Sequence, residues 1–331
     1  MTHKDRLFAA LNRRIPDHVP TFELEFQLAP VMFGGYLKPE STHFKTLHTL
    51  SQREREKRLY DMAAFYAYVY DQLDHSAISL AGVDGHLGGL NPETNRFSPE
   101  YELFIRYLRE ITADRVPLAM VACGTFAVPD GNEMYTFAYR TADDPDGLCA
   151  EAQARADDAA RSIRASAELG ISVVLECSDY CYNSGPFLSP EMFGEFIQPY
   201  LAQEVEAARH SGMYFIKHTD GNIMPIIDQL VDCAPHALHS LDPMAGVDIR
   251  TVKERYGNRV CLCGNVHCAA MQTGTVEEVQ QSAEYCLTYG KPGGGYIYCT
   301  SNIPFRGLPP ERYQLVLDVW KRMRAYETRA A

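Results

Sequence analysis

The sequence predicts a (β/α)8 barrel with an N-terminal helical extension. Short apolar strands alternate with helical segments along the chain, and polar residues follow the strands at their C-terminal ends. In this fold the C-terminal ends of the strands build the active site. The eight expected strands are residues 19–26, 77–81, 118–122, 172–176, 214–217, 237–241, 260–263 and 295–298.

The helices expected between these strands have recognisable start signals. Thr2 can cap a helix over residues 4–12, and Ser189-Pro190 opens a helix that reaches about His210. Thr275 and Glu278 resemble a capping box. Further helices are expected over residues 147–169, 223–231, 248–257 and 309–323. The 331 residues suit one domain, 1–331.

Residues 27–70 are longer than a barrel needs and end in a Tyr-rich helical stretch, residues 59–70. We expect this excursion to cap the barrel mouth or to contribute to a homodimer contact. The aromatic residues there fit an aromatic ligand as well as ordinary packing.

Composition excludes several classes of partner. The formal net charge is −12 and no Lys/Arg-rich block is present, which argues against a nucleic-acid ligand. No apolar run is long enough to cross a bilayer, and the N-terminal residues lack the apolar region of a signal peptide. We therefore expect a cytoplasmic protein without a membrane partner.

The ten cysteines are expected to be mostly small buried side chains, since disulfides are rare in a reducing cytosol. The run from Cys261 to Cys268 invites a metal site. It lacks the wider spacing and second pair of dedicated zinc sites, so its strand is interpreted as core, with His267 and Cys268 in the next loop or helix.

Four segments of the C-terminal half follow one another in a specific order: HTDGNIMPIIDQL, LDPMAGVDIRTVKERYG, LCGNVHCAAMQTGTVEEVQ and PGGGYIYCTSNIPF. In this order, and with the N-terminal KDRLFAALNRRIPDHVPTFELEF, the chain resembles the uroporphyrinogen decarboxylase superfamily. The resemblance implies the barrel fold. It leaves open porphyrinogen decarboxylation, zinc-dependent corrinoid:thiol methyl transfer, or demethylation of methoxylated compounds onto a corrinoid protein.

One departure from the family argues against the true decarboxylases. Their first strand is followed by an Arg-rich segment that grips the propionates of the substrate, whereas residues 23–30 here contain two acids and no arginine. Such a mouth would repel a substrate with eight carboxylates. Uroporphyrinogen is therefore rejected as the substrate, and the corrinoid-dependent methyltransferase branch is favoured.

The resemblance also suggests a zinc site. The thiol-activating methyltransferases hold zinc with a His-x-Cys after strand 5 and a Cys after strand 8. His218 and Cys299 match, but Asp220 replaces the middle cysteine, and Asp242 occupies the place of an acid that follows strand 6 in that family. The expected zinc ligands are therefore His218, Cys299, and Asp220 or Asp242. The alternative is that Asp220 caps the next helix and His218 is a hydrogen-bonded core histidine.

Further polar residues near the strand ends are candidates for catalysis or substrate binding. Asp179 and Tyr180 could protonate a leaving oxygen, with Glu176 beside them, although a surface loop with a capping Asp is also consistent. Glu23 and Glu25, if inside the barrel, would need a metal, a cation or donors; otherwise they are an exposed pair at the mouth. The remaining candidates for substrate contact are Asp84, Asn265 and Asn302.

The leading hypothesis is a zinc-assisted methyltransferase of the O-demethylase type. It would move a methyl group from a small methoxylated or methylated substrate to cobalamin on a partner corrinoid protein that docks over the barrel mouth. The first alternative is a metal-free decarboxylase of a small acid, with Asp84 or Asp179 protonating the product. The second is a barrel that binds a ligand without chemistry.

Overall fold

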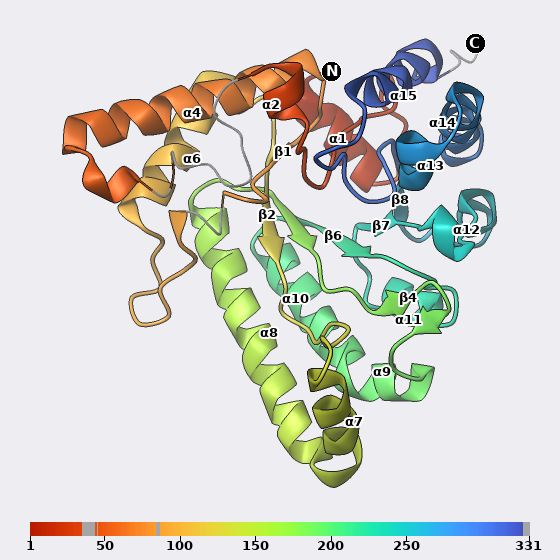
Figure 1. Ribbon diagram of the computed structural model, residues 1–331. Helices are drawn as coiled ribbons and strands as arrows, with labels where there is room; N and C mark the ends of the chain where they lie inside the picture. The colour runs from red at the N-terminus through yellow and green to blue at the C-terminus, as the bar shows by residue number, and fades with distance from the viewer. Residues whose placement is uncertain (35–43, 45, 84–86, 327–331) are drawn as a thin grey trace.

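The computed structural model describes residues 1–326 except 35–43, 45 and 84–86. Its centre is a parallel sheet that curls into a barrel (Figure 1). The strand order is β1-β2-β3-β6-β7-β8-β9. These strands are Ile78–Ser79, Leu118–Ala122, Val173–Glu176, Tyr214–Thr219, Ala237–Ser240, Cys261–Gly264 and Tyr296–Ile297. Seven of the eight strands predicted from the sequence are therefore confirmed, and the predicted fold class is correct.

The first predicted strand, residues 19–26, lies in its expected place without forming a regular ladder. The Tyr298 amide donates to the Pro20 carbonyl at 2.9 Å, and the Ser76 amide donates to the Thr21 carbonyl at 2.6 Å. Thr21 also forms an isolated parallel bridge with Tyr298. This segment therefore closes the barrel between β9 and β1. Pro20 has no amide proton, which explains part of the missing ladder.

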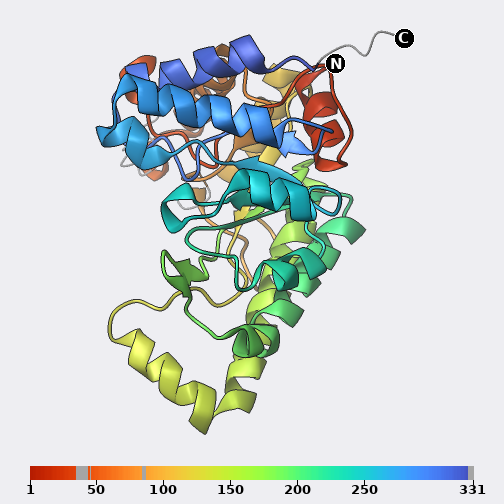
Figure 2. The same ribbon diagram turned by 90° about the vertical axis from the view of Figure 1, so that its right-hand side faces the viewer.

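The helices surround the sheet (Figures 1 and 2). Those at the N-terminal side and in the long excursions are α1 (His3–Leu11), α2 (Ala29–Met32), η1 (Leu47–Thr49), α4 (Gln52–Gln72), α6 (Pro99–Thr112), α7 (Glu133–Asp143) and α8 (Pro145–Glu168). Those of the C-terminal half are α9 (Pro190–Phe196), α10 (Gln198–His210), α11 (Ile227–Asp232), η2 (Pro243–Ala245), α12 (Ile249–Tyr256), α13 (Cys268–Thr273), α14 (Val276–Gly290) and α15 (Pro310–Met323).

The helix caps predicted at Thr2, Ser189 and Thr275 are confirmed. The Thr2 side chain accepts from the Asp5 amide at the start of α1, and Thr275 with Glu278 forms a capping box on α14. The helix expected to run from Ser189 to His210 is interrupted at Ile197, so it forms α9 and α10. His267 caps α13 and Cys268 begins it, as expected from the sequence.

The tyrosine-rich stretch belongs to α4, which begins earlier than predicted and packs against α6 (Figure 1). The Tyr66 and Phe104 rings meet edge to face at 5.6 Å. The aromatic residues therefore include genuine packing contacts. Within the described part of the chain, no helix is both long and apolar enough to cross a lipid bilayer.

Two apolar layers lie on the two faces of the strands. The inner layer fills the barrel with Phe22, Leu24, Ile216 and Ile297, and α1 contributes Leu7 and Leu11 among others. Phe8 of α1 packs on Tyr214, at the first residue of β6, with ring centroids 4.4 Å apart. The helix α1 therefore lies at the N-terminal end of the barrel interior, and the polar strand ends lie at the opposite end.

Candidate functional site

Side chains of successive residues on a strand point to opposite faces, and this alternation builds the site. Ile216 is in the inner layer, so His218 also points into the barrel while Lys217 points outward. By the same alternation His239 follows Ala237, Cys263 follows Cys261 and Cys299 follows Ile297 on the inner face. The barrel interior below the mouth is therefore lined by two imidazoles and three thiols, those of His218, His239, Cys261, Cys263 and Cys299.

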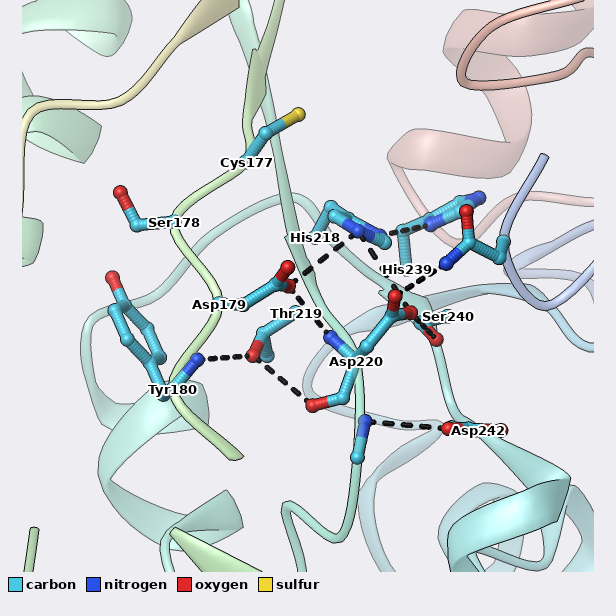
Figure 3. A network of polar contacts seen from close by, with 12 residues as sticks. Cys177, Ser178, Asp179, Tyr180, His218, Thr219, Asp220, His239, Ser240 and Asp242 are labelled. Atoms are coloured by element: carbon cyan, nitrogen blue, oxygen red, sulfur yellow. Dashed lines mark hydrogen bonds and ion pairs between the residues drawn. The ribbon is translucent and has the colours of Figure 1, made fainter. Parts of the chain in front are cut away.

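His218 lies at the centre of a cluster with two carboxylates (Figure 3). Its Nε2 is 3.6 Å from Asp179 Oδ1 and 3.8 Å from Asp220 Oδ1. The three ligand-type atoms all lie within 4.8 Å of one another. The side chain of His218 is 6% exposed, against 45% for Asp179 and 28% for Asp220. The imidazole is thus buried, while both carboxylates reach solvent at the mouth.

Asp220 is fixed by neighbours from two other strand ends. The Ser240 hydroxyl donates to Asp220 Oδ1 at 2.7 Å (Figure 3). The Asn302 amide donates to Asp220 Oδ2. The Asp220 amide in turn donates to Asp179 Oδ1 at 2.9 Å. The structure therefore brings together four of the predicted site residues: Asp179, His218, Asp220 and Asn302.

The electrostatics of this cluster follow from burial and crowded negative charge. Burial raises the pKa of Asp220 to about 7, with Asp179 and Asp242 adding to the rise and the Ser240 hydrogen bond opposing it. Burial lowers the pKa of His218 to about 4, and the nearby Lys217 also lowers it while Asp179 opposes. A neutral imidazole beside carboxylates is the form that can coordinate a metal.

Cys299 is not where the sequence analysis placed it. Its Sγ lies 3.4 Å from Cys263 Sγ, and these two thiols form a group with His239. The group is joined to the first cluster by a contact of 2.8 Å between the Nδ1 atoms of His218 and His239. In the described part of the chain, Cys299 is therefore grouped with Cys263 of the neighbouring strand β8, and not with His218 and an aspartate.

Asp242, the other predicted zinc ligand, accepts hydrogen bonds from backbone amides. Its Oδ1 accepts from the Met244 amide at 2.9 Å and caps η2, and its Oδ2 accepts from the Gly221 amide at 3.4 Å. Among the described residues, neither group with metal-ligand spacing contains Asp242. Of the two aspartates weighed as a ligand, the geometry therefore favours Asp220.

Glu176 and Tyr180 point away from the mouth. Glu176 is fully buried and forms an ion pair with Lys217, whose Nζ also donates to the Ser178 carbonyl at 2.6 Å. The Tyr180 hydroxyl is buried against Thr125 Oγ1 at 2.6 Å, and its ring lies 3.9 Å from Lys217 Nζ. Figure 3 shows the Tyr180 ring directed away from His218. Glu176 and Tyr180 therefore do not lie at the barrel mouth, where they were expected to act on a leaving group.

The two glutamates of the first segment differ in surroundings. Phe22 and Leu24 fill the barrel, so Glu23 faces the outer layer and accepts from the Thr300 hydroxyl at 2.6 Å. Burial raises the pKa of Glu23 to about 8, although hydrogen bonds from Thr300 and Tyr313 oppose the rise. Glu25 is partly exposed and accepts from Gln27 Nε2 at 3.1 Å. Glu23 is therefore buried outside the barrel interior and bound to hydrogen-bond donors, so it is not part of an exposed pair at the mouth.

Asn265 and Asp84 complete the predicted set. The Asn265 amide donates to the Leu241 carbonyl at 2.6 Å, and its oxygen accepts from the Cys286 thiol at 3.3 Å. Asn265 therefore joins the segment after β7 to α14 and does not reach into the mouth. Asp84 lies outside the described residues.

Sequence reasoning missed His239 and Ser240, and it interpreted Cys263 as a core residue. Their signal was present as polar residues and a thiol in the buried strands 237–240 and 261–264. Only the pairing of β7 with β6 and β8 shows what they contact.

The fold and the strand-end site together define an enzyme-type (β/α)8 barrel. A sequence model of the family described as "Uroporphyrinogen decarboxylase (URO-D)" matches residues 93–323, more than half of the chain, and the chain belongs to this family. The resemblance inferred from the sequence is thereby confirmed. No curated protein matches the sequence.

One solved structure shares the fold over nearly the whole chain. A methyltransferase from Methanosarcina mazei superposes with a TM-score of 0.73 at 18% identity, over 97% of this chain and 99% of that chain. At this identity the match shows that the two chains share the fold. A sugar phosphate isomerase/epimerase from Parabacteroides distasonis is more distant, with a TM-score of 0.44 and 12% identity over 80% of this chain and 88% of that chain.

The donor chemistry of the first cluster fits a catalytic zinc. Asp179, His218 and Asp220 offer two carboxylate oxygens and one imidazole nitrogen, and three protein ligands with one open position are usual for such a site. Ser240, Asn302 and His239 form hydrogen bonds with Asp220 and His218, as the outer residues of metal sites commonly do with the ligands.

Proposed function

We propose that this protein is a zinc-assisted methyltransferase of the O-demethylase type. It takes a methyl group from a small methoxylated or methylated compound and transfers it to the cobalamin of a partner corrinoid protein. The observation that carries the proposal is the cluster of Asp179, His218 and Asp220 at the barrel mouth. Family membership and the likeness to a methyltransferase structure support it.

A methyl group on an ether oxygen is a poor electrophile because the oxygen leaves as an anion. A bound zinc ion supplies a positive charge that stabilises such an anion. His218 Nε2, Asp220 Oδ1 and Asp179 Oδ1 would hold the ion, so Asp179, first considered as a proton donor, becomes the third ligand. Ser240 and Asn302 keep Asp220 in one orientation. Glu25 and Asn302 remain the proposed substrate contacts among the described residues.

The corrinoid is assigned to a partner protein on the family resemblance. The chain itself contains one short match, Asp84 to Gly89, to the Asp-x-His-x-x-Gly pattern that binds cobalamin in such partners. Three of its residues, 84–86, lie outside the described residues. Cobalamin binding to the isolated chain therefore needs to be measured as a control in any transfer assay.

The test is methyl transfer in a purified system. The chain, loaded with zinc, is mixed with a reduced corrinoid protein and a panel of methoxybenzoates and methylamines, and the corrinoid absorption spectrum is followed. We expect transfer from at least one donor, with a loss of at least about 100-fold in Asp220→Asn. Transfer that is unaffected by zinc removal and by Asp220→Asn would contradict the proposal.

A second candidate is a metal-free decarboxylase of a small carboxylic acid. The observation that favours it is the raised pKa of Asp220, about 7, which lets this buried carboxyl carry a proton near neutral pH. Release of carbon dioxide from a panel of small acids by the zinc-free chain would favour this candidate. If neither panel reacts, a barrel that binds a ligand without chemistry becomes the better account.

A further inference from the structure

The second group with metal-ligand spacing lies deeper in the barrel than the His218 cluster. It consists of His239 on β7, Cys263 on β8 and Cys299, two residues after β9. The ligand-type atoms of the three side chains lie within 4.8 Å of one another, and the two sulfur atoms are 3.4 Å apart. All three residues are fully buried. Three strands that are neighbours in the sheet thus direct one nitrogen and two sulfurs to the same place.

One ring nitrogen of His239 is buried without a hydrogen-bond partner. Its Nδ1 contacts His218, but its Nε2 is buried without a hydrogen-bond partner. The inner layer around it is apolar and includes Phe22 and Ile297. A buried polar atom without a hydrogen-bond partner lowers the stability of the fold. A bound ligand that contacts His239 Nε2 would remove this cost.

The alternative is that the cysteines are merely small core residues. Cys261 provides an internal comparison, because it lies on the same strand as Cys263 and on the same inner face, and it is equally buried. Within the described chain, Cys261 belongs to no group with metal-ligand spacing. The close approach of His239, Cys263 and Cys299 is therefore not a general property of the buried thiols.

We propose that His239 Nε2, Cys263 Sγ and Cys299 Sγ form a second metal site, specific for a thiophilic divalent cation such as zinc. One imidazole and two thiolates are a known zinc ligand set, and sulfur ligands disfavour magnesium and calcium. The site does not depend on the methyl-transfer proposal, because it shares no ligand with the Asp179–His218–Asp220 cluster.

The contact between His218 and His239 couples the two sites. A hydrogen bond between two Nδ1 atoms contains one hydrogen, so one ring donates and the other accepts. The accepting neutral ring has its own hydrogen on Nε2, which then cannot coordinate a metal. With both rings neutral, only one of the two Nε2 atoms is free, and metal at one site disfavours metal at the other.

The experiment uses cobalt as a spectroscopic substitute for zinc. The full chain is produced in cobalt-supplemented medium, its cobalt content is measured, and its near-ultraviolet absorption is examined for a thiolate-to-cobalt charge-transfer band. The variants are Cys263→Ser and Cys299→Ser, and the matched control is Cys261→Ser. Circular dichroism of each variant checks that it is folded.

We expect the band in the wild-type protein and in Cys261→Ser, and its loss in Cys263→Ser and in Cys299→Ser. Asp220→Asn must keep or strengthen the band, because the mouth cluster contains no sulfur. A wild-type protein that contains cobalt without the band, or that contains no metal after this preparation, would overturn the second site. Two metal ions per chain would overturn the coupling between the sites.

Discussion

The two faces of the paired strands β3 and β6 have opposite chemistry. On the outer face, Glu176 and Lys217 are register partners that form a fully buried ion pair. On the inner face and beyond the strand ends, His218, Asp179 and Asp220 form a cluster that reaches solvent. Lys217 and His218 are adjacent in the sequence, and Asp179 follows Glu176 by three residues. The comparison shows that neighbouring residues of one strand can have different roles, because their side chains point to opposite faces of the sheet. Lys217 stabilises the outer layer, whereas His218 belongs to the candidate site.

The burial of the two sets explains their different roles. The ion pair lies between the sheet and the helices, with the buried Glu204 of α10 close by. Burial raises the pKa of Glu204 well above its usual range, and the charge of Glu176 raises it further while Lys217 opposes. The positive charge of Lys217 therefore offsets the buried carboxyl groups of Glu176 and Glu204.

The largest effect is expected for Lys217→Met. The change removes the cation and leaves the Glu176 carboxyl buried without its partner, which costs about 3–5 kcal/mol of the free energy of unfolding. Urea unfolding of the two proteins measures the difference. The double variant Lys217→Met/Glu176→Gln should recover part of the loss. A loss below about 1 kcal/mol would show that the outer pair is not structural.

The next effect concerns the pH dependence of stability. The pKa of Glu23 is raised to about 8 in the folded protein, so folding favours its protonated form. Its contribution is full below the unfolded pKa near 4.5 and is lost as the pH rises toward 8, by on the order of 2–4 kcal/mol. Thermal or urea unfolding between these pH values should show this fall in the wild type and a smaller one in Glu23→Gln. Equal falls in both proteins would contradict the assignment.

A smaller effect tests the support of the inner cluster. Ser240→Ala removes the hydrogen bond that orients Asp220, and we expect zinc affinity to fall about 10- to 100-fold. Competition with a chromophoric chelator measures the affinity, and Thr219→Ser, which keeps the neighbouring hydroxyl, is the control. Unchanged affinity in Ser240→Ala would mean that Asp220 is not a ligand.

The smallest effect is expected for Tyr180→Phe. The hydroxyl bonds only to Thr125 among the contacts of the described residues, so its loss should cost about 1 kcal/mol of stability. Methyl-transfer activity should stay within about twofold of the wild type. A large loss of activity in a stable variant would restore Tyr180 as a catalytic candidate.

Sequence reasoning found what depends on local pattern and missed what depends on pairing across strands. The strand positions, the caps at Thr2 and Thr275, and the convergence of His218 with Asp220 follow from alternation and from the fold class. Alternation does not say which face is inside, which is why the sequence left Glu23 open between the barrel interior and an exposed place at the mouth. Cys299 was assigned by family analogy, whereas its contact with Cys263 is set by the pairing of neighbouring strands.

The central claim is that Asp179, His218 and Asp220 hold a metal at the barrel mouth. The most direct measurement is the zinc content of the double variant Cys263→Ser/Cys299→Ser, which removes the buried thiols, compared with the same protein carrying His218→Ala. The account predicts close to one zinc per chain in the first protein and almost none in the second. No zinc in the double variant, or zinc that survives His218→Ala, would contradict it.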